Sequence, residues 1–200
     1  MIKNIIFDFG DVFINLDKSA TMQALVKAGY KEIPEGLFPL VFSYEKGIID
    51  TQSFIDAVRG FLPNSTEEEI MEAWNAIILD FPEKRLQFLQ KLANTQNYRL
   101  FLLSNTNELH IQKVISQLGE RKYEAFKAFF EGFYLSHRIG MRKPDPEIFK
   151  MFLTEHGLKA KETLFVDDTL EHILSAKSLG FQTWHLMVGK EDVTELNSHT

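Results

Sequence analysis

Five short apolar runs, separated by amphipathic segments, constrain the fold of this chain more than any other feature. Continuous apolar runs of this length indicate strands that are buried on both faces, as in a parallel sheet covered by helices. Strands that alternate with helices in this way predict an α/β fold with a doubly wound parallel sheet. The runs lie at residues 5–7, 99–103, 132–135, 163–166 and 181–186.

The segments between the later runs carry start and stop signals of helices. Asp145 and Pro146 are typical of the N-cap and the first position of a helix, and we expect this helix to end at Gly157. A second helix is expected to follow Asp168 and to end at Gly180. The apolar positions of this second helix are Leu170, Ile173, Leu174 and Leu179.

The stretch from about residue 16 to residue 82 holds only helical patterns. Asp50 is expected to begin one helix, and the sequence at residues 65–68 resembles a capping box that begins another. This stretch is too long for a single crossover between strands. The sequence therefore predicts a Rossmann-like core formed by residues 1–15 and 83–200, with a small helical cap, residues 16–82, inserted after the first strand. One irregular α/β domain with ordinary crossover helices is the alternative.

Composition argues against several classes of function. The net charge is −6, and no basic stripe of the kind found in nucleic-acid binders is visible. The chain has 0 Cys, which excludes disulfides, thiolate metal sites and a thiol nucleophile. The apolar run at the N-terminus ends at Asp8, and no stretch approaches the roughly 20 apolar residues of a membrane-spanning helix. We therefore expect a cytoplasmic protein that binds neither nucleic acid nor membranes; its oligomeric state stays open.

Three of the apolar runs end in polar residues: one at Asp8, one at Ser104 and Asn105, and one at Asp167 and Asp168. Ligands of open α/β sheets bind outside the carboxyl ends of the strands, so these side chains are expected to meet at one edge. Clustered carboxylates repel each other, and a cation relieves the repulsion. Hard oxygen ligands suit Mg²⁺, which typically also binds a substrate phosphate. The strand ends therefore predict a magnesium and phosphate site.

Lys143 has a defined direction because Pro144, which follows it, restricts its backbone to an extended conformation. An isolated lysine is usually solvated at the surface. Beside a site of carboxylates and Mg²⁺, Lys143 could instead neutralise a substrate phosphate as a point charge.

Four segments, in order along the chain, resemble the motifs of the haloacid dehalogenase superfamily. The resemblance covers the whole chain, and the helical stretch lies where that superfamily has its cap. The chain is most similar to the subgroup of bacterial alpha-D-glucose-1-phosphate phosphatases and, more distantly, the N-terminal phosphatase domain of soluble epoxide hydrolase. The four segments are Phe7-Asp8-Phe9-Gly10, Leu103-Ser104-Asn105-Thr106, Lys143-Pro144 and Phe165-Val166-Asp167-Asp168.

The resemblance implies a Mg²⁺-dependent phosphatase that hydrolyses a small phosphorylated metabolite, such as a sugar phosphate, through an aspartyl-phosphate. Asp8 would be the nucleophile and also a metal ligand. The backbone carbonyl of Gly10 would be a second ligand and Asp168 a third.

The resemblance also implies how the phosphate is held. Ser104 and the amides around Asn105 would bind the phosphate oxygens. Lys143 would neutralise the phosphate and orient the nucleophile. Asp167 would lie beside the metal ligand that follows it, as a partner of the metal or of Lys143.

One position departs from the superfamily pattern. Most of its phosphatases carry an acid two residues after the nucleophile, where this chain has Gly10. Asp11 follows one residue later, and its side chain is expected to point elsewhere. General acid–base catalysis contributes roughly 10²–10⁴-fold, so its loss should slow the hydrolysis of simple alkyl phosphates. A sugar 1-phosphate has a better leaving group, a hemiacetal oxygen.

The helical stretch is expected to supply specificity. Glu45 either faces the site or is a solvated charge near the helix end at Gly47, and both interpretations stay open. His110 is expected on the surface of a helix. Four aromatic residues are expected in the core of the cap: Phe38, Phe42, Tyr44 and Trp74.

Two other functions stay open. A 2-haloacid dehalogenase also lacks the second acid, but it needs no metal and has no acidic pair after the fourth strand, so Asp167 and Asp168 argue against it. A phospholigand-binding protein of low turnover is favoured only by Gly10. The presence of Asp8 and Lys143 counts against it.

Overall fold

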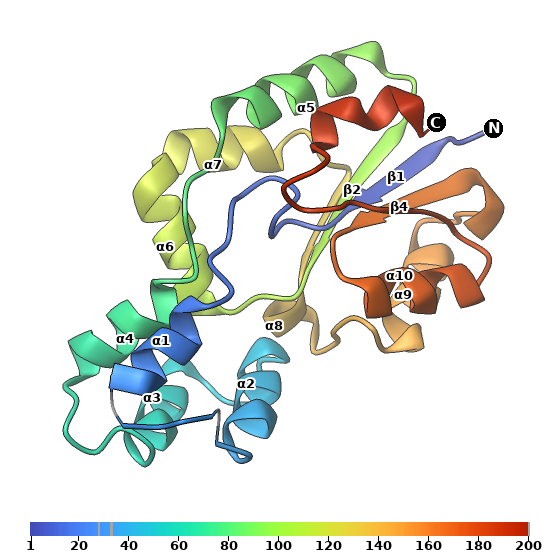
Figure 1. Ribbon diagram of the computed structural model, residues 1–200. Helices are drawn as coiled ribbons and strands as arrows, with labels where there is room; N and C mark the ends of the chain where they lie inside the picture. The colour runs from blue at the N-terminus through green and yellow to red at the C-terminus, as the bar shows by residue number, and fades with distance from the viewer. Residues whose placement is uncertain (28, 33, 200) are drawn as a thin grey trace.

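The computed structural model describes residues 1–27, 29–32 and 34–199 (Figure 1). Its centre is a five-stranded sheet in the order β3-β2-β1-β4-β5, and every neighbouring pair is parallel. Strands β2 and β3 lie on one side of the central strand β1, and β4 and β5 lie on the other, which makes the carboxyl end of β1 a topological switch point. Each strand coincides with one of the apolar runs: β1 (Asn4–Phe7), β2 (Arg99–Ser104), β3 (Gly132–Leu135), β4 (Thr163–Asp167) and β5 (Gln182–His185).

Helices cover both faces of the sheet, as the apolar runs predict (Figure 1). Ile5 and Phe7 of β1 pack on one face, and Ile6 between them packs on the other. The first face is covered by α5 (Glu83–Thr95), α6 (Glu108–Leu118), α7 (Glu120–Lys127) and the short C-terminal helix η2 (Val193–Ser198). The second is covered by α9 (Pro146–Glu155) and α10 (Leu170–Ser178). Two short elements connect strands and helices: α8 (Ser136–Ile139) and η1 (Ala160–Glu162).

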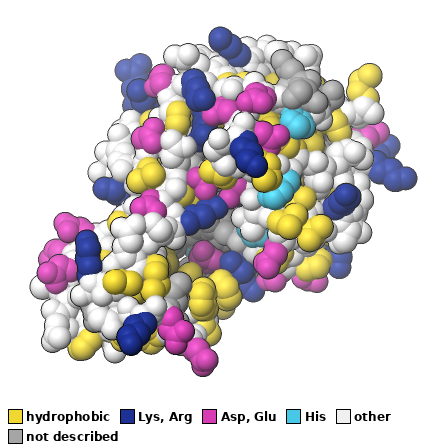
Figure 2. All heavy atoms as spheres, viewed as in Figure 1, with side chains coloured by type: hydrophobic (Ala, Val, Ile, Leu, Met, Phe, Trp, Pro, Cys, Tyr) yellow, Lys and Arg dark blue, Asp and Glu magenta, His cyan; other side chains and the backbone are white. Residues whose placement is uncertain are grey.

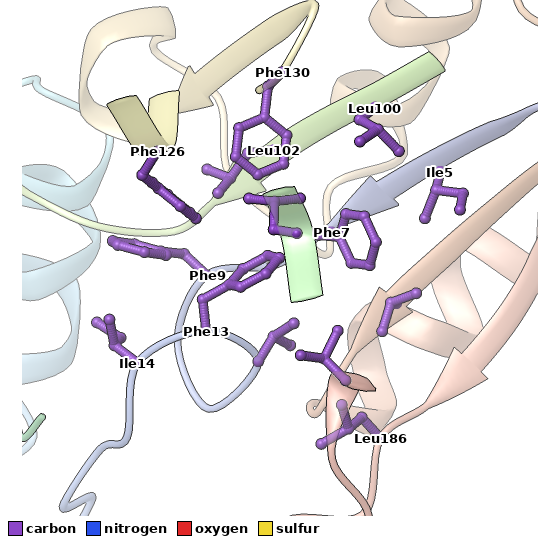
Figure 3. Close-up of a cluster of buried hydrophobic side chains, with 14 of the residues drawn as sticks. Ile5, Phe7, Phe9, Phe13, Ile14, Leu100, Leu102, Phe126, Phe130 and Leu186 are labelled. Atoms are coloured by element: carbon purple, nitrogen blue, oxygen red, sulfur yellow. The ribbon is translucent and has the colours of Figure 1, made fainter. Parts of the chain in front are cut away.

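Phenylalanine rings anchor the loop that follows β1 (Figure 3). Phe9 stacks on Phe126 of α7 with ring centroids 5.4 Å apart. Phe13 contacts Phe7 at 5.4 Å and Phe126 at 5.3 Å. Such ring pairs add about 0.5–1.5 kcal/mol each to the burial of their surface. Because Asp8 lies between two of these buried rings, its position at the end of β1 is fixed by the core.

Four helices between β1 and α5 form a separate hydrophobic cluster, which we call the helical insertion (Figure 1). Asp50 caps one of them by accepting a hydrogen bond from Ser53 N at 2.8 Å. Thr66 and Glu69 form a capping box at the start of another, one residue later than the box predicted at residues 65–68. The four are α1 (Ala20–Lys27), α2 (Leu37–Glu45), α3 (Thr51–Arg59) and α4 (Glu67–Asn75).

Two antiparallel segments connect the insertion to the sheet. Asn15 N donates to Asp80 O at 2.9 Å, and Leu79 N donates to Asn15 O at 3.0 Å. Arg85 of α5 holds the Asn15 side chain through a 3.0 Å hydrogen bond. The insertion is thus joined to the sheet by two segments that are hydrogen-bonded to each other, and not by two independent loops.

The predicted start of α9 is confirmed, because Asp145 is its N-cap and Pro146 its first residue. The Asp145 side chain makes no capping hydrogen bond and pairs with Lys46 of the insertion. Leu170 and Leu174 are more than half exposed, because only the face of α10 with Ile173 turns toward the sheet. None of the helices in the described ranges combines the length and the apolar character that crossing a bilayer requires.

Candidate active site

The carboxyl ends of β1 and β4 bring three carboxylates together. Phe7 pairs with Val166 in the parallel register, so the residues that follow them emerge side by side. Asp8, Asp167 and Asp168 each place a carboxylate oxygen within 4.8 Å of the other two. The meeting of strand ends expected from the sequence is therefore present.

Lys143 lies inside this cluster and not at the surface. Its side chain is 0% exposed, and its ammonium group donates to Asp8 Oδ1 at 2.6 Å, Asp167 Oδ2 at 2.7 Å and Leu103 O at 2.8 Å. All three N–H bonds of the ammonium are thereby used. Asn105 fixes the lysine backbone: its side chain accepts from Lys143 N at 2.9 Å and donates to Lys143 O at 2.8 Å.

The charges of this cluster shift one another. Burial raises the pKa of Asp8 to about 7, against the opposing effect of Lys143. Burial also acts on Asp167, but Lys143 and His172 outweigh it and lower the pKa of this carboxyl to about 2. Despite its burial, the pKa of Lys143 is raised by the two aspartates. Asp167 is thus a permanent anion that holds the lysine charged.

A cavity of about 610 Å³ opens onto one side of the cluster. Figure 2 shows the corresponding hollow between the helical insertion and the part of the molecule that contains the sheet, with acidic and basic side chains at its edge. Asp8 and Asp168 line the cavity, whereas Asp167 and Lys143 lie behind its wall. A ligand in the cavity can therefore contact Asp8 directly, whereas Lys143 acts on the ligand through its ion pair with Asp8.

Ser104 and Asn105 also line the cavity, at the end of β2. The Asn105 amide group is engaged by the backbone of Lys143, so it positions that lysine and is not free for a ligand. The next amide, Thr106 N, donates to Ser136 Oγ at 2.9 Å. The Ser104 hydroxyl makes only a 3.5 Å contact with the carbonyl that follows it, which leaves it available to an anion.

Gly10 lines the cavity, and Asp11 does not replace the missing acid. Asp11 has a φ of 55°. Asp11 is not among the residues that line the cavity, and its carboxylate accepts from Leu16 N at 3.0 Å and pairs with Lys18 at 3.0 Å. The expectation that Asp11 points elsewhere agrees with this geometry.

Two residues at the site were not identified from the sequence. Lys18, from the start of the insertion, bridges Asp11 and Asp168. His172, on the first turns of α10, places Nδ1 3.0 Å from Asp167 Oδ1. The sequence could have indicated His172, because this residue lies on the helix that follows the acidic pair. Nothing in the sequence around Lys18 indicates the partners of Lys18.

The donor set fits a divalent cation. Four carboxyl groups face two ammonium groups, and a divalent cation would balance the excess of two negative charges that arises when all four carboxyl groups are ionised. Carboxylate oxygens that open onto a cavity are hard ligands of the type that Mg²⁺ prefers. Asp8 and Asp168 line the cavity, whereas Asp167 does not and is bound by Lys143 and His172. The charges counted are those of Asp8, Asp11, Asp167, Asp168, Lys18 and Lys143.

The insertion contributes one wall of the cavity. Glu45 faces it, with its carboxylate bound to Arg142. Phe38 and Phe42 are 49% and 42% exposed and line the cavity, so the prediction that they belong to the core of the insertion is wrong. The other two aromatic residues, Tyr44 and Trp74, pack in the insertion's cluster as predicted.

His110 joins the insertion to the sheet. Its ring stacks on Trp74 of α4 with centroids 5.0 Å apart, and Nε2 lies 3.2 Å from Trp74 O. Burial lowers the pKa of His110 to about 4, so the ring is neutral at pH 7 and donates from Nε2. The prediction of a histidine on a helix surface is therefore wrong, because the insertion covers this part of α6.

Known proteins are similar to this chain in sequence and in fold. A model of the haloacid dehalogenase-like hydrolase family matches residues 2–180. A D-ribitol-5-phosphate phosphatase of Bacteroides thetaiotaomicron is 30% identical over 193 residues, which are 92% of this chain and 91% of the relative.

Solved structures agree. A haloacid dehalogenase-family enzyme of Bacteroides thetaiotaomicron, solved with magnesium and inorganic phosphate, superposes with a TM-score of 0.79. It is 34% identical, and the match covers 96% of this chain and 97% of that one. An L-2-haloacid dehalogenase of Xanthobacter autotrophicus has a TM-score of 0.58 at 18% identity, over 100% of this chain and 84% of that one. This last likeness concerns the fold alone.

Proposed function

Since the chain belongs to the haloacid dehalogenase-like hydrolases, we propose that it is a Mg²⁺-dependent phosphatase of small phosphorylated metabolites. One observation carries the proposal: Asp8 is held by a buried lysine and opens onto a cavity beside a second carboxylate that lines it, Asp168. The activity of the ribitol-phosphate phosphatase and the magnesium and phosphate in the solved relative support it.

In the proposed reaction an oxygen of Asp8 attacks phosphorus. The new O–P bond forms as the bond from phosphorus to the leaving oxygen breaks; the electron pair goes to that oxygen, which takes a proton from solvent water, and the hydrolysis that follows returns a proton to the solvent. Water then attacks the phosphorus of the aspartyl-phosphate, which releases inorganic phosphate and restores the carboxylate. Lys143 offsets negative charge at the attacking carboxylate. Bound by Asp8, Asp168 and the Gly10 carbonyl, Mg²⁺ would reduce the repulsion between nucleophile and phosphate.

We assign the substrate to the sugar and polyol monophosphates, and residues 16–82 to a cap that selects it. Glu45 and Phe42 on the cavity wall support this role, because both come from the insertion. Ser104 would bind a phosphate oxygen, and Asn105 would act by fixing Lys143. Dehalogenation has no comparable support, since the likeness to the dehalogenase concerns the fold alone.

Removal of divalent ions tests the proposal. EDTA should lower phosphate release from D-ribitol 5-phosphate and from p-nitrophenyl phosphate by about two to three orders of magnitude, because a metal supplies several kcal/mol of charge stabilisation. Excess Mg²⁺ should restore the rate, and EDTA already saturated with Mg²⁺ should have no effect. Unchanged activity in EDTA would contradict a metal-dependent phosphatase.

Gly10 leads to a second prediction, on leaving groups. With no carboxyl two residues after Asp8, the rate should depend steeply on the pKa of the leaving oxygen. Glucose 1-phosphate and aryl phosphates should react faster than sugar 6-phosphates. The measurement is log kcat/KM against leaving-group pKa. A flat plot, with chemistry shown to be rate-limiting by single-turnover kinetics, would mean that another side chain donates the proton.

A variant sharpens this test. Gly10→Asp restores a carboxyl at that position, but its Cβ would lie 2.7 Å from Leu16 Cδ1. The substitution is therefore made in a Leu16→Ala background, with Leu16→Ala alone as control. A carboxyl that donates a proton should flatten the plot relative to this control.

A further inference from the structure

We propose that Arg142 determines the specificity of this site by donating hydrogen bonds to the uncharged hydroxyl groups of a monophosphorylated polyol. The inference rests on the proposed phosphatase function and deepens it. It concerns the part of the substrate that leaves, and not the phosphate.

Arg142 is held rigidly on one edge and one face. Its Nε and Nη2 donate to Glu45 Oε2 at 3.0 and 2.9 Å. Its Cζ lies 4.1 Å from the centroid of the Phe42 ring, a cation–π geometry. The arginine side chain is only 16% exposed. A planar guanidinium fixed in this way loses little further freedom when it binds a ligand.

The remaining edge of the guanidinium is free to act on a ligand. Arginine has five N–H donors, and the Nη1 group forms no hydrogen bond with any residue in the described ranges. Arg142 lines the same cavity as Asp8 and Ser104. One ligand in this cavity can therefore contact both Asp8 and Arg142.

The charge around Arg142 selects hydroxyl groups over a second anion. Glu45 neutralises the guanidinium, and burial raises the pKa of this glutamate against the effect of the arginine. Lys46 is paired with Asp145 at 2.8 Å, and a further acid, Glu171, lines the cavity. Among the described residues that line the cavity, a second phosphate would meet no unpaired lysine or arginine, whereas a hydroxyl needs only a donor and an acceptor. The exposed ring of Phe38 offers an apolar surface for the carbon chain.

The contacts of Arg142 with Glu45 and Phe42 join the helical insertion to the part of the molecule that contains the sheet. Glu45 and Phe42 belong to α2, whereas Arg142 belongs to the segment that leads into Lys143. Directly after α2, Gly47 has a φ of 64°, and a Cβ there would lie 2.1 Å from His137 O of α8. The chain thus packs tightly against α8 at this point, which keeps Glu45 against Arg142.

Arg142→Met tests the proposal with two substrates. The variant should lower kcat/KM for D-ribitol 5-phosphate about 10- to 100-fold, the usual effect of a lost hydrogen bond to a charged group. It should change kcat/KM for p-nitrophenyl phosphate, which has no hydroxyl, less than about threefold. Free ribitol, as a competitive inhibitor of p-nitrophenyl phosphate hydrolysis, should bind more weakly by a similar factor. Arg138→Met, at an exposed arginine of α8, is the matched control.

Two further variants separate the alternatives. Arg142→Lys keeps the charge but loses the planar fork, so it should resemble Arg142→Met; it also serves if the methionine variant does not fold. Glu45→Gln removes the neutralising charge and should raise kcat/KM for a sugar bisphosphate relative to the monophosphate. Equal losses for both substrates, or no loss for either, would overturn the role of Arg142. A wild-type protein inactive on both substrates with Mg²⁺ would instead refute the phosphatase function.

Discussion

Replacing Asp8 by asparagine is expected to lower kcat by at least about four orders of magnitude while the fold stays intact, as for other covalent nucleophiles. The amide keeps the shape of the side chain but removes its negative charge and its nucleophilic oxygen. The structure accommodates the change, because Lys143 keeps its bonds to Asp167 and to Leu103 O. Burial already raises the pKa of the Asp8 carboxyl to about 7, which means that its negative charge is unfavourable in the folded protein. Its removal should therefore not lower the free energy of unfolding.

The measurement is steady-state phosphate release together with thermal unfolding of the variant. Beryllium fluoride, which mimics a phosphoryl group, should bind covalently to Asp8 in the wild type and not in the variant. Asp56→Asn, at an exposed carboxylate of α3, is the control and should leave kcat unchanged. Near-normal turnover of the Asp8 variant would remove the covalent mechanism.

Replacing Lys143 by methionine is expected to lower the free energy of unfolding by about 3–5 kcal/mol, the usual cost of removing one partner of a buried ion pair. Two carboxylates, Asp8 and Asp167, would then face each other without the cation between them. Turnover should also fall about 10²–10³-fold, because a fixed positive charge near the transferred phosphoryl group is lost.

Urea denaturation at several pH values measures this effect. The lowered pKa of Asp167, about 2, stabilises the wild type at pH above its ordinary value of 3.8, and this stability is lost as the pH falls toward 2. Without Lys143 that contribution disappears, so the difference between variant and wild type should be larger at pH 7 than at pH 3. Lys150→Met, at an exposed lysine of α9, should change little. An unchanged free energy of unfolding in the Lys143 variant would contradict the buried network.

The strands and most helix starts could be predicted because their signals are local. Apolar runs mark the strands, and Asp50 and Thr66 cap the helices that follow them. The gathering of Asp8 with Asp167 also follows from local signals, because parallel strands end at one edge.

The remaining features depend on tertiary contacts. An aromatic residue on an amphipathic helix packs in a core or faces a cavity according to what covers it, which is why Phe42 was misplaced and Tyr44 was not. His110 is half-buried because α4, distant in sequence, lies against α6. Arg142 and Lys18 find their partners across the junction of the insertion and the sheet, and no periodicity in the sequence records such a pairing.

The central place of β1 affects how the protein is made. This strand is synthesised before the other four strands, yet it hydrogen-bonds to β2 and β4. Its residue Asn4 pairs with Arg99 of β2 and with Thr163 of β4. The bond between Lys143 and Asp8 spans 135 residues. Contacts of such long range form late and slowly, because a long loop must close before they contribute. During synthesis on the ribosome, β1 therefore has no partner strand until β2 has been made. A nascent chain that ends before β4 leaves one edge of β1 unpaired, and an unpaired apolar edge favours aggregation.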